Sequence, residues 1–154
     1  MARRRWDPSL SAAENARLHL PALAQKYFET GRAVIEAGPS PATLHKFRLA
    51  TKRFRYTLEM FSKYYGPRLD EFLERLRKIQ DLLGSVNDDA TTRTLMEGRL
   101  PGARRIRFER FLEARMRESV SAFHAFWKQT FDGPGEEERW VRHLAASPGA
   151  QRDE

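Results

Sequence analysis

One segment of the sequence carries basic side chains at a spacing that suits phosphate binding. Four of them recur every three or four residues: His45, Arg48, Lys52 and Arg55. On an α-helix this spacing gathers them on one face, which extends for about 15 Å. Arginine binds phosphate oxygens in a bidentate fork, lysine supplies a compact charge, and a protonated histidine adds a donor. We call this row the basic stripe, and its length favours an elongated polyanion over a single phosphate.

The other side of the same segment is apolar. With about 100° of rotation per residue, the basic stripe faces away from an apolar row: Phe47, Phe54, Leu58 and Phe61. Neighbouring like charges in the stripe repel each other, and Glu59 offers the one local counter-charge. A bound anion would supply the missing partner, whereas an ordinary solvated helix face is the other interpretation that the spacing allows.

Further basic residues could extend this surface. Arg53 lies on the same segment but off the stripe, where it could serve a second surface or contact water. The next helix adds three candidate ligands: Arg75, Arg77 and Lys78. Two other groups read equally well as ordinary surface, namely the three arginines at positions 3–5 and the four between residues 104 and 110.

The charge balance points to an anionic partner. The chain has 28 Lys and Arg against 21 Asp and Glu, which gives a net charge of +7 and a pI near 10.1. Such a field attracts nucleic acids and phosphate polymers. The absence of cysteine excludes disulfides and thiolate chemistry, and the histidines lack metal-ligand spacing. Asp88 and Asp89 are best explained as helix-capping residues. We therefore expect no metal, no cofactor and no enzyme activity.

Helices must position these candidates, because no segment shows the alternation of a strand. A first helix is predicted to begin at Ser9 or Ser11. Gly38 ends it, and Ser40 with Pro41 begins the second. The expected fold is therefore an all-α, antiparallel bundle of four to five helices with short connections.

The middle of the chain is expected to hold three linked helices. The second helix covers residues 42–64 and ends at Gly66. The third is predicted to stop at Gly84, after which Asn87 or Asp88 caps a short fourth helix.

The rest of the chain completes the predicted organisation. A turn at 98–102 precedes a long helix, and a short helix surrounds Trp140. We divide the chain into a basic N-terminal arm (1–8), a helical bundle (9–131) and a C-terminal extension (132–154) that ends in a disordered tail. No secretory leader and no apolar stretch of about 20 residues is evident, so we expect a cytoplasmic protein without membrane contact.

Two parts of the sequence together resemble the CHAD domain, a histidine-containing α-helical domain. The first is the run LHKFRLATKRFRYTLE at 44–59, and the second is the run IQDLLGSVND at 79–88. A Tyr-Gly pair at 65–66 lies between them. A signature in two parts is more specific than any single basic motif.

The resemblance implies a module that binds inorganic polyphosphate without catalysis, with basic helices that line a central pore. It also implies an association with polyphosphate granules. The positions that match the family are His45, Arg48, Lys52, Arg53 and Arg55. On the next helix the alignment is less definite, and the candidate polyphosphate ligands there are Arg75, Arg77 and Lys78.

The chain departs from the family pattern in one respect. A full domain resembles two similar four-helix halves, whereas this sequence holds one His/Arg/Lys unit. We therefore expect two copies to pair about a two-fold axis, so that a homodimer rebuilds the basic channel. Two rival functions stay open: a nucleic-acid-binding helical protein, and a histidine phosphotransfer protein that uses His45.

Overall fold

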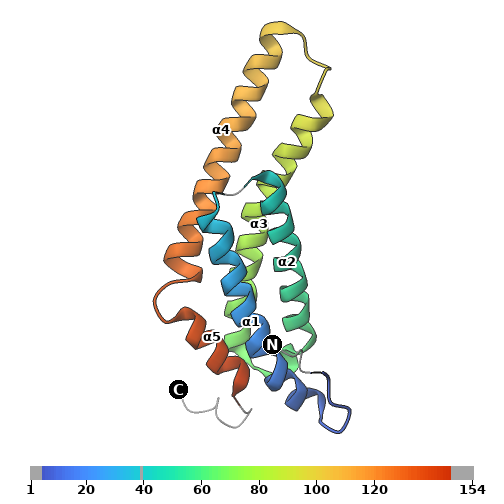
Figure 1. The fold of residues 1–154 in the computed structure, drawn as a ribbon, viewed down its shortest axis with the longest axis vertical. Helices are drawn as coiled ribbons and strands as arrows, with labels where there is room; N and C mark the ends of the chain where they lie inside the picture. Colours follow the sequence, from blue (N-terminus) through green and yellow to red (C-terminus); the bar gives the residue numbers. More distant parts are fainter. Residues whose placement is uncertain (1–4, 39, 147–154) are drawn as a thin grey trace.

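Five α-helices form the chain in the computed structural model, which describes residues 5–38 and 40–146. No strand occurs in these ranges, so the predicted all-α bundle is confirmed. Helix α1 packs against α2 and α5, and α3 packs against α2 and α4 (Figure 1). The helices are α1 (Ala12–Glu36), α2 (Pro41–Met60), α3 (Pro67–Met96), α4 (Gly102–Phe126) and α5 (Glu136–Ala145).

The starts of the first two helices follow from local chemistry. The amide of Glu14 donates to Ser11 Oγ at 3.3 Å, and the amide of Ser11 donates to the Glu14 carboxylate at 2.8 Å. These two bonds satisfy otherwise free amides at the start of α1. Ser40 caps α2 through one such bond, in which the amide of Thr43 donates to Ser40 Oγ at 3.2 Å, and Pro41 is the first residue of the helix. The predicted helix starts at Ser11 and Ser40 are therefore confirmed.

The predicted break at Gly84 is wrong. Helix α3 runs for 30 residues without interruption, and neither Asn87 nor Asp88 caps a new helix. Glycine inside a helix costs roughly 1 kcal/mol, which tertiary packing of the buried Leu83 and Val86 offsets here. Gly84 lies beside α2: a Cβ at this position would lie 3.6 Å from Arg48 Nε, at van der Waals distance.

Buried aromatic side chains from all five helices and from one π-helical turn form the centre of the core. Trp127 and Phe131 lie on a π-helical turn (Trp127–Phe131) that continues α4. A Cβ on Gly31 would lie 2.0 Å from the Trp127 ring, so only glycine lets α1 approach this closely. Trp140 of α5 stacks on Phe72 of α3 with ring centroids 4.0 Å apart. The helix of the expected C-terminal extension is thus packed into the same core as the bundle.

Arginines attach the α4–α5 connection to the bundle through an ion-pair network that we call the clamp. Arg32 of α1 donates to both carboxylate oxygens of Asp132 at 2.8 and 2.6 Å and pairs with Glu137 at 2.6 Å. Arg75 of α3 pairs with Glu136 at 2.7 Å and donates to a backbone carbonyl at 3.1 Å. Each clamp arginine therefore has an acidic partner supplied by the fold.

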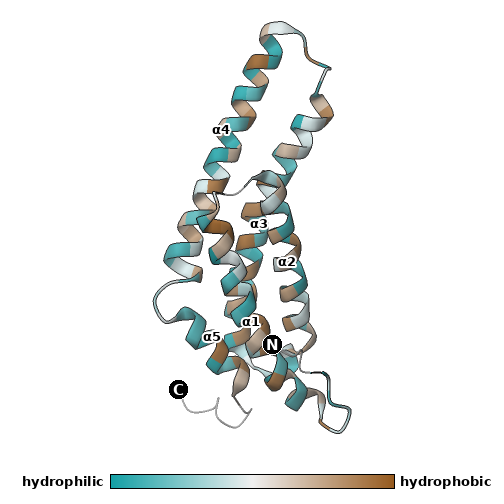
Figure 2. Ribbon diagram, viewed as in Figure 1, coloured by the Kyte–Doolittle hydropathy of each residue, from teal (hydrophilic) through white to brown (hydrophobic). Residues whose placement is uncertain are grey.

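The outer ends of α3 and α4 project beyond the other helices as a two-helix arm (Figure 1). Two ion pairs cross its base: Arg115 with Asp89 at 3.3 Å, and Arg93 with Glu113 at 3.6 Å. Hydrophilic and hydrophobic residues are mixed along the arm (Figure 2). Across residues 5–38 and 40–146, no helix is both long and apolar enough to cross a membrane.

Candidate functional site

The basic stripe lies along the line where α2 meets α3, which we call the seam. His45 Nδ1 lies 2.7 Å from Asn87 Oδ1, and Arg55 Nε donates to Gln80 Oε1 at 3.0 Å. Positions that advance along α2 meet positions that recede along α3, as expected for antiparallel neighbours. The sequence predicts that the stripe faces away from the apolar row, and the structure adds the position of α3. Helix α3 covers the arc beside the apolar row, so most of the stripe is half-buried.

One end of the seam is electrically balanced. Arg55 pairs with Glu59 at 2.7 Å, and Glu59 also accepts from Arg77 at 3.2 Å. Arg77 makes a second ion pair with Glu74, whose hydrogen bond raises the pKa of Arg77 above its ordinary value. Two arginines and two glutamates therefore cancel each other at this end, and the expected counter-charge role of Glu59 extends to both helices.

The other end of the seam lacks acidic partners. Within the described ranges, no hydrogen bond or ion pair joins Arg48 or Lys52 to an acidic side chain. Arg48 Nε is shielded from solvent and has no hydrogen-bond partner. Leaving such a donor unpaired costs about 1–3 kcal/mol, and more for a charged group. Gly84 of α3 faces this group, since a Cβ there would lie 3.6 Å from Arg48 Nε, and glycine offers it no side-chain acceptor.

An exposed tyrosine, which sequence reasoning missed, orients the cations of α2. Arg55 Cζ lies 4.6 Å and Lys52 Nζ 5.7 Å from the centroid of the Tyr56 ring. The ring thus holds both side chains by cation–π contacts, each of which contributes about 0.5–1 kcal/mol at exposed sites. Tyr56 itself is 45 % exposed. Its place in the basic run was visible, but its orientation depends on where α3 packs.

The predicted ligands do not all meet. The structure brings together His45, Arg48, Lys52, Arg55 and Arg77 at the seam. Three other candidates lie elsewhere. Arg53 is exposed on α2, about 100° around the helix from Lys52. Lys78 is exposed on α3, directly after Arg77 in the sequence. Arg75 belongs to the clamp.

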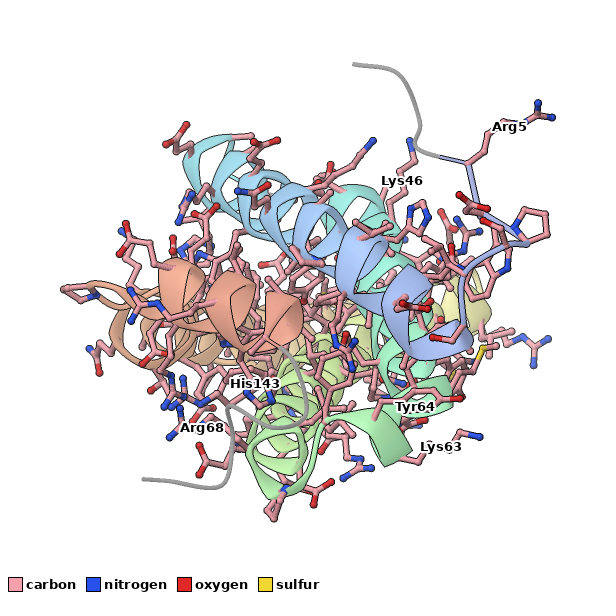
Figure 3. The ribbon with its side chains drawn as sticks, turned by 90° about the horizontal axis from the view of Figure 1, so that it is seen from below. Arg5, Lys46, Lys63, Tyr64, Arg68 and His143 are labelled. Carbon is pink, nitrogen blue, oxygen red and sulfur yellow. The ribbon has the colours of Figure 1, made fainter. Side chains whose placement is uncertain are left out.

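Further cations lie around the side of the molecule that α2 occupies. Viewed from below the bundle, Arg5, Lys46 and Lys63 project outward on that side (Figure 3). Arg5 belongs to the predicted basic N-terminal segment (1–8), whose other arginines lie outside the described residues. The proposed disordered tail at 147–154 also lies outside them. These exposed cations reinforce the positive field around the seam.

The seam is separate from the hollow at the base of the arm. In the part of the chain that the structure describes, no group of histidine and acidic residues could hold a metal ion. A hollow of about 490 Å³ lies between the start of α2 and the arm, and its apolar lining includes Leu44, Val86 and Met116. The cations of the seam do not line that hollow. The geometry therefore suits an elongated anion lying along two helices.

Comparison with known proteins gives one match. The family model described as CHAD domain matches residues 2–97 of the 154-residue chain. This stretch contains α1, α2 and α3, and hence both walls of the seam. No curated protein and no solved structure matches the chain.

Proposed function

The chain belongs to the CHAD domain family, and on this premise we propose that it binds inorganic polyphosphate along the seam without catalysing a reaction. One observation carries the proposal. Arg48 and Lys52 face a half-buried surface that supplies them with no acid, and Arg48 Nε has no partner at all. A phosphate oxygen at this position would satisfy the buried donor and neutralise the adjacent lysine.

The length of the seam supports a polymer over a compact anion. The row from His45 to Arg55 extends for about 15 Å along α2, so consecutive phosphates could contact consecutive side chains. Asn87 holds the His45 ring at the end nearest the arm. Arg55 lies at the other end, where Glu59 already shares its charge. We expect the tightest contacts between these two ends, at Arg48 and Lys52.

A second copy of the chain would complete the site. Helix α2 carries an exposed apolar ridge beside the basic stripe: Leu49, Tyr56 and Met60, the last 74 % exposed. If two ridges pair about a two-fold axis, each copy contributes its stripe to one channel. Light scattering should then detect a dimer, at least with polyphosphate present. A monomer both with and without polyphosphate would contradict the pairing.

Nucleic acid is the second candidate, and Tyr56 is the observation that favours it. Exposed aromatic rings among cations can stack bases. Inorganic polyphosphate is the better supported ligand, because Lys52 and Arg55 already lie over the Tyr56 ring. The other α2 aromatics, Phe47 and Phe54, are buried. Competition between polyphosphate and single-stranded DNA at equal charge separates the two. Stronger displacement by DNA would favour the rival.

The proposal is tested by removing the two unpaired cations. In Arg48→Gln/Lys52→Gln, affinity for polyphosphate of defined length should fall about 100-fold, since two charged hydrogen bonds of about 1.5 kcal/mol each are lost. The control Lys26→Gln/Arg142→Gln removes the same charge from exposed, unpaired positions. Equal losses of affinity in both variants would mean that binding depends on total charge and not on the seam. For the cellular setting, we propose the cytoplasm, at polyphosphate granules.

A further inference from the structure

The outer end of the arm holds a second concentration of cations. Five arginines and one glutamate, Glu109, occur between residues 98 and 110. All five are exposed. They are Arg99 in the turn and Arg104, Arg105, Arg107 and Arg110 on the first half of α4. We call this group the arm-tip arginines.

The arm-tip arginines lack acidic partners. Among residues 5–38 and 40–146, no side-chain hydrogen bond or ion pair reaches any of these five guanidinium groups. At the arm base, by contrast, Arg93 and Arg115 are both paired with acids. Like charges three residues apart on a helix repel by a few tenths of a kcal/mol, as between Arg104 and Arg107. No third helix contributes counter-charges there, because the arm consists of α3 and α4 alone (Figure 1).

The arm tip is electrostatically separate from the seam. Arg93 and the first residue of α2, Pro41, line the same hollow, so the arm base lies level with the start of α2. Following α3 from Gly84 to Arg93 and then α4 outward to Arg107 covers roughly 20 Å. Charges at this distance are screened from one another at physiological salt, where the Debye length is about 8 Å. A ligand on the seam therefore leaves the arm tip in need of its own anion.

We propose that the arm-tip arginines form a second polyphosphate-binding surface, so that each chain holds two separate stretches of polyanion. The proposal rests on the proposed function for the identity of the ligand. Arginine suits this role because its planar guanidinium binds two phosphate oxygens at once. A long polyphosphate chain held at the seam of one molecule can then be held at the arm tip of another, which cross-links protein and polymer.

The apolar residues of the arm argue against other anionic partners. Phe111 is exposed, but the guanidinium of Arg115 lies 5.5 Å from its ring centroid and covers one face against stacked bases. Ile106 is also exposed. The step of five residues from Ile106 to Phe111 turns the helix by about 140° beyond one full turn. The two side chains therefore form no continuous apolar face of the kind that inserts into a bilayer.

Calorimetric titration with polyphosphate too short to reach both surfaces tests the proposal. The wild-type chain should bind two molecules in two separate binding events, one at the seam, alone or in the shared channel of a dimer, and one at the arm tip. The variant R104Q/R105Q/R107Q/R110Q should bind one, at the seam, with the remaining affinity changed less than threefold. The seam variant Arg48→Gln/Lys52→Gln should still bind polyphosphate at the arm tip. The control K26Q/R117Q/K128Q/R142Q removes the same charge from exposed positions outside both surfaces and should still bind two.

The outcomes separate the two proposals. If the arm variant still binds two molecules, the arm-tip surface is refuted and the seam is unaffected. If the seam variant still binds two, the proposed function at the seam fails while the arm tip stands. Parallel titrations with single-stranded DNA and with vesicles of anionic and neutral phospholipid complete the test. An arm variant that loses either of these partners while keeping two polyphosphates would overturn the choice of ligand.

Discussion

Arginines on the two sides of α3 meet opposite surroundings. In the clamp, Arg32 and Arg75 lie within 2.8 Å of carboxylates from the α4–α5 connection and the start of α5. The bond to Asp132 raises the pKa of Arg32 above its ordinary value. At the seam, Arg48 and Lys52 are equally half-buried but meet no carboxylate. The fold thus completes one set of charges and leaves the other set incomplete.

This difference indicates that an arginine becomes a structural or a binding residue according to whether the fold places an acidic side chain beside it. A paired, half-buried arginine contributes to the free energy of folding. An unpaired one carries a desolvation cost that a ligand can relieve. If this is correct, adding an acidic partner at the seam should weaken ligand binding, and breaking the ion pairs of the clamp should weaken folding.

The largest expected effect comes from giving the seam an acid of its own. In Gly84→Glu, the Cβ of the new side chain would lie 3.6 Å from Arg48 Nε, which places its carboxylate within reach of the guanidinium. Polyphosphate affinity should fall at least 100-fold, because the added charge both pairs Arg48 and repels the ligand. The melting temperature should rise, since glutamate is a better helix former than glycine.

Gly84→Gln is the matched control for that change. It adds nearly the same volume and helix propensity without the charge. Fluorescence or calorimetric titration should find its affinity reduced far less than that of Gly84→Glu. Equal reductions would mean that covering the guanidinium matters more than pairing it.

Breaking the clamp should lower the stability of the fold and leave polyphosphate affinity nearly unchanged. Arg32→Gln leaves Asp132 and Glu137 unpaired beside the core. The free energy of unfolding should fall by about 2 kcal/mol, the scale of charged hydrogen bonds at partly buried sites. Urea denaturation measures this loss. Polyphosphate affinity should stay within about twofold, and a loss comparable to that of the seam variant would contradict the division of roles.

A smaller effect is expected at the end of the seam nearest the arm. Asn87→Ala removes the 2.7 Å contact with His45 Nδ1 and frees the imidazole to leave the seam. Affinity should fall about fivefold, which corresponds to roughly 1 kcal/mol, while stability changes little because Asn87 lies at the surface edge of α3. Asn87→Asp should weaken binding more than Asn87→Ala does, since it adds an acid to the seam. If Asn87→Ala weakened binding more than Asn87→Asp, His45 would not be part of the binding site.

The smallest predicted effect is a pH dependence of stability that arises beside α5. Burial lowers the pKa of His143 below its ordinary 6.5, helped by Arg68 and Arg139. The unfolded chain therefore takes up this proton first as the pH falls. Stability is intact above pH 6.5 and declines below it, until the folded state also becomes protonated. Urea melts at several pH values should show a weaker decline in His143→Gln, and an unchanged slope would assign it to other groups.

Local features of the fold were predictable, and features that depend on distant contacts were not. The caps at Ser11 and Ser40 use side chains within three residues of the amides they bind, so the sequence pattern was sufficient. The continuity of α3 was not predictable from Gly84, because packing by Leu83 and Val86 outweighs a local glycine penalty.

The same reasoning applies to the candidate site. Spacing identified the basic stripe on α2, since a helical repeat places those residues together regardless of the rest of the fold. It could not separate Arg77 from Arg75, because that distinction depends on Glu59 and on Glu136, which lies 61 residues beyond Arg75. Nor could it identify Asn87 as the partner of His45, 42 residues away.

The most direct test of the account follows the Arg48 side chain itself. Its Nε–H signal in a heteronuclear NMR spectrum can be assigned by its loss in Arg48→Gln. On addition of polyphosphate this signal should shift and become protected from solvent exchange, while the Nε–H signals of Arg32 and Arg75 stay in place. A titration in which polyphosphate binds but the Arg48 signal does not move would contradict the claim that the unpaired seam is the binding site.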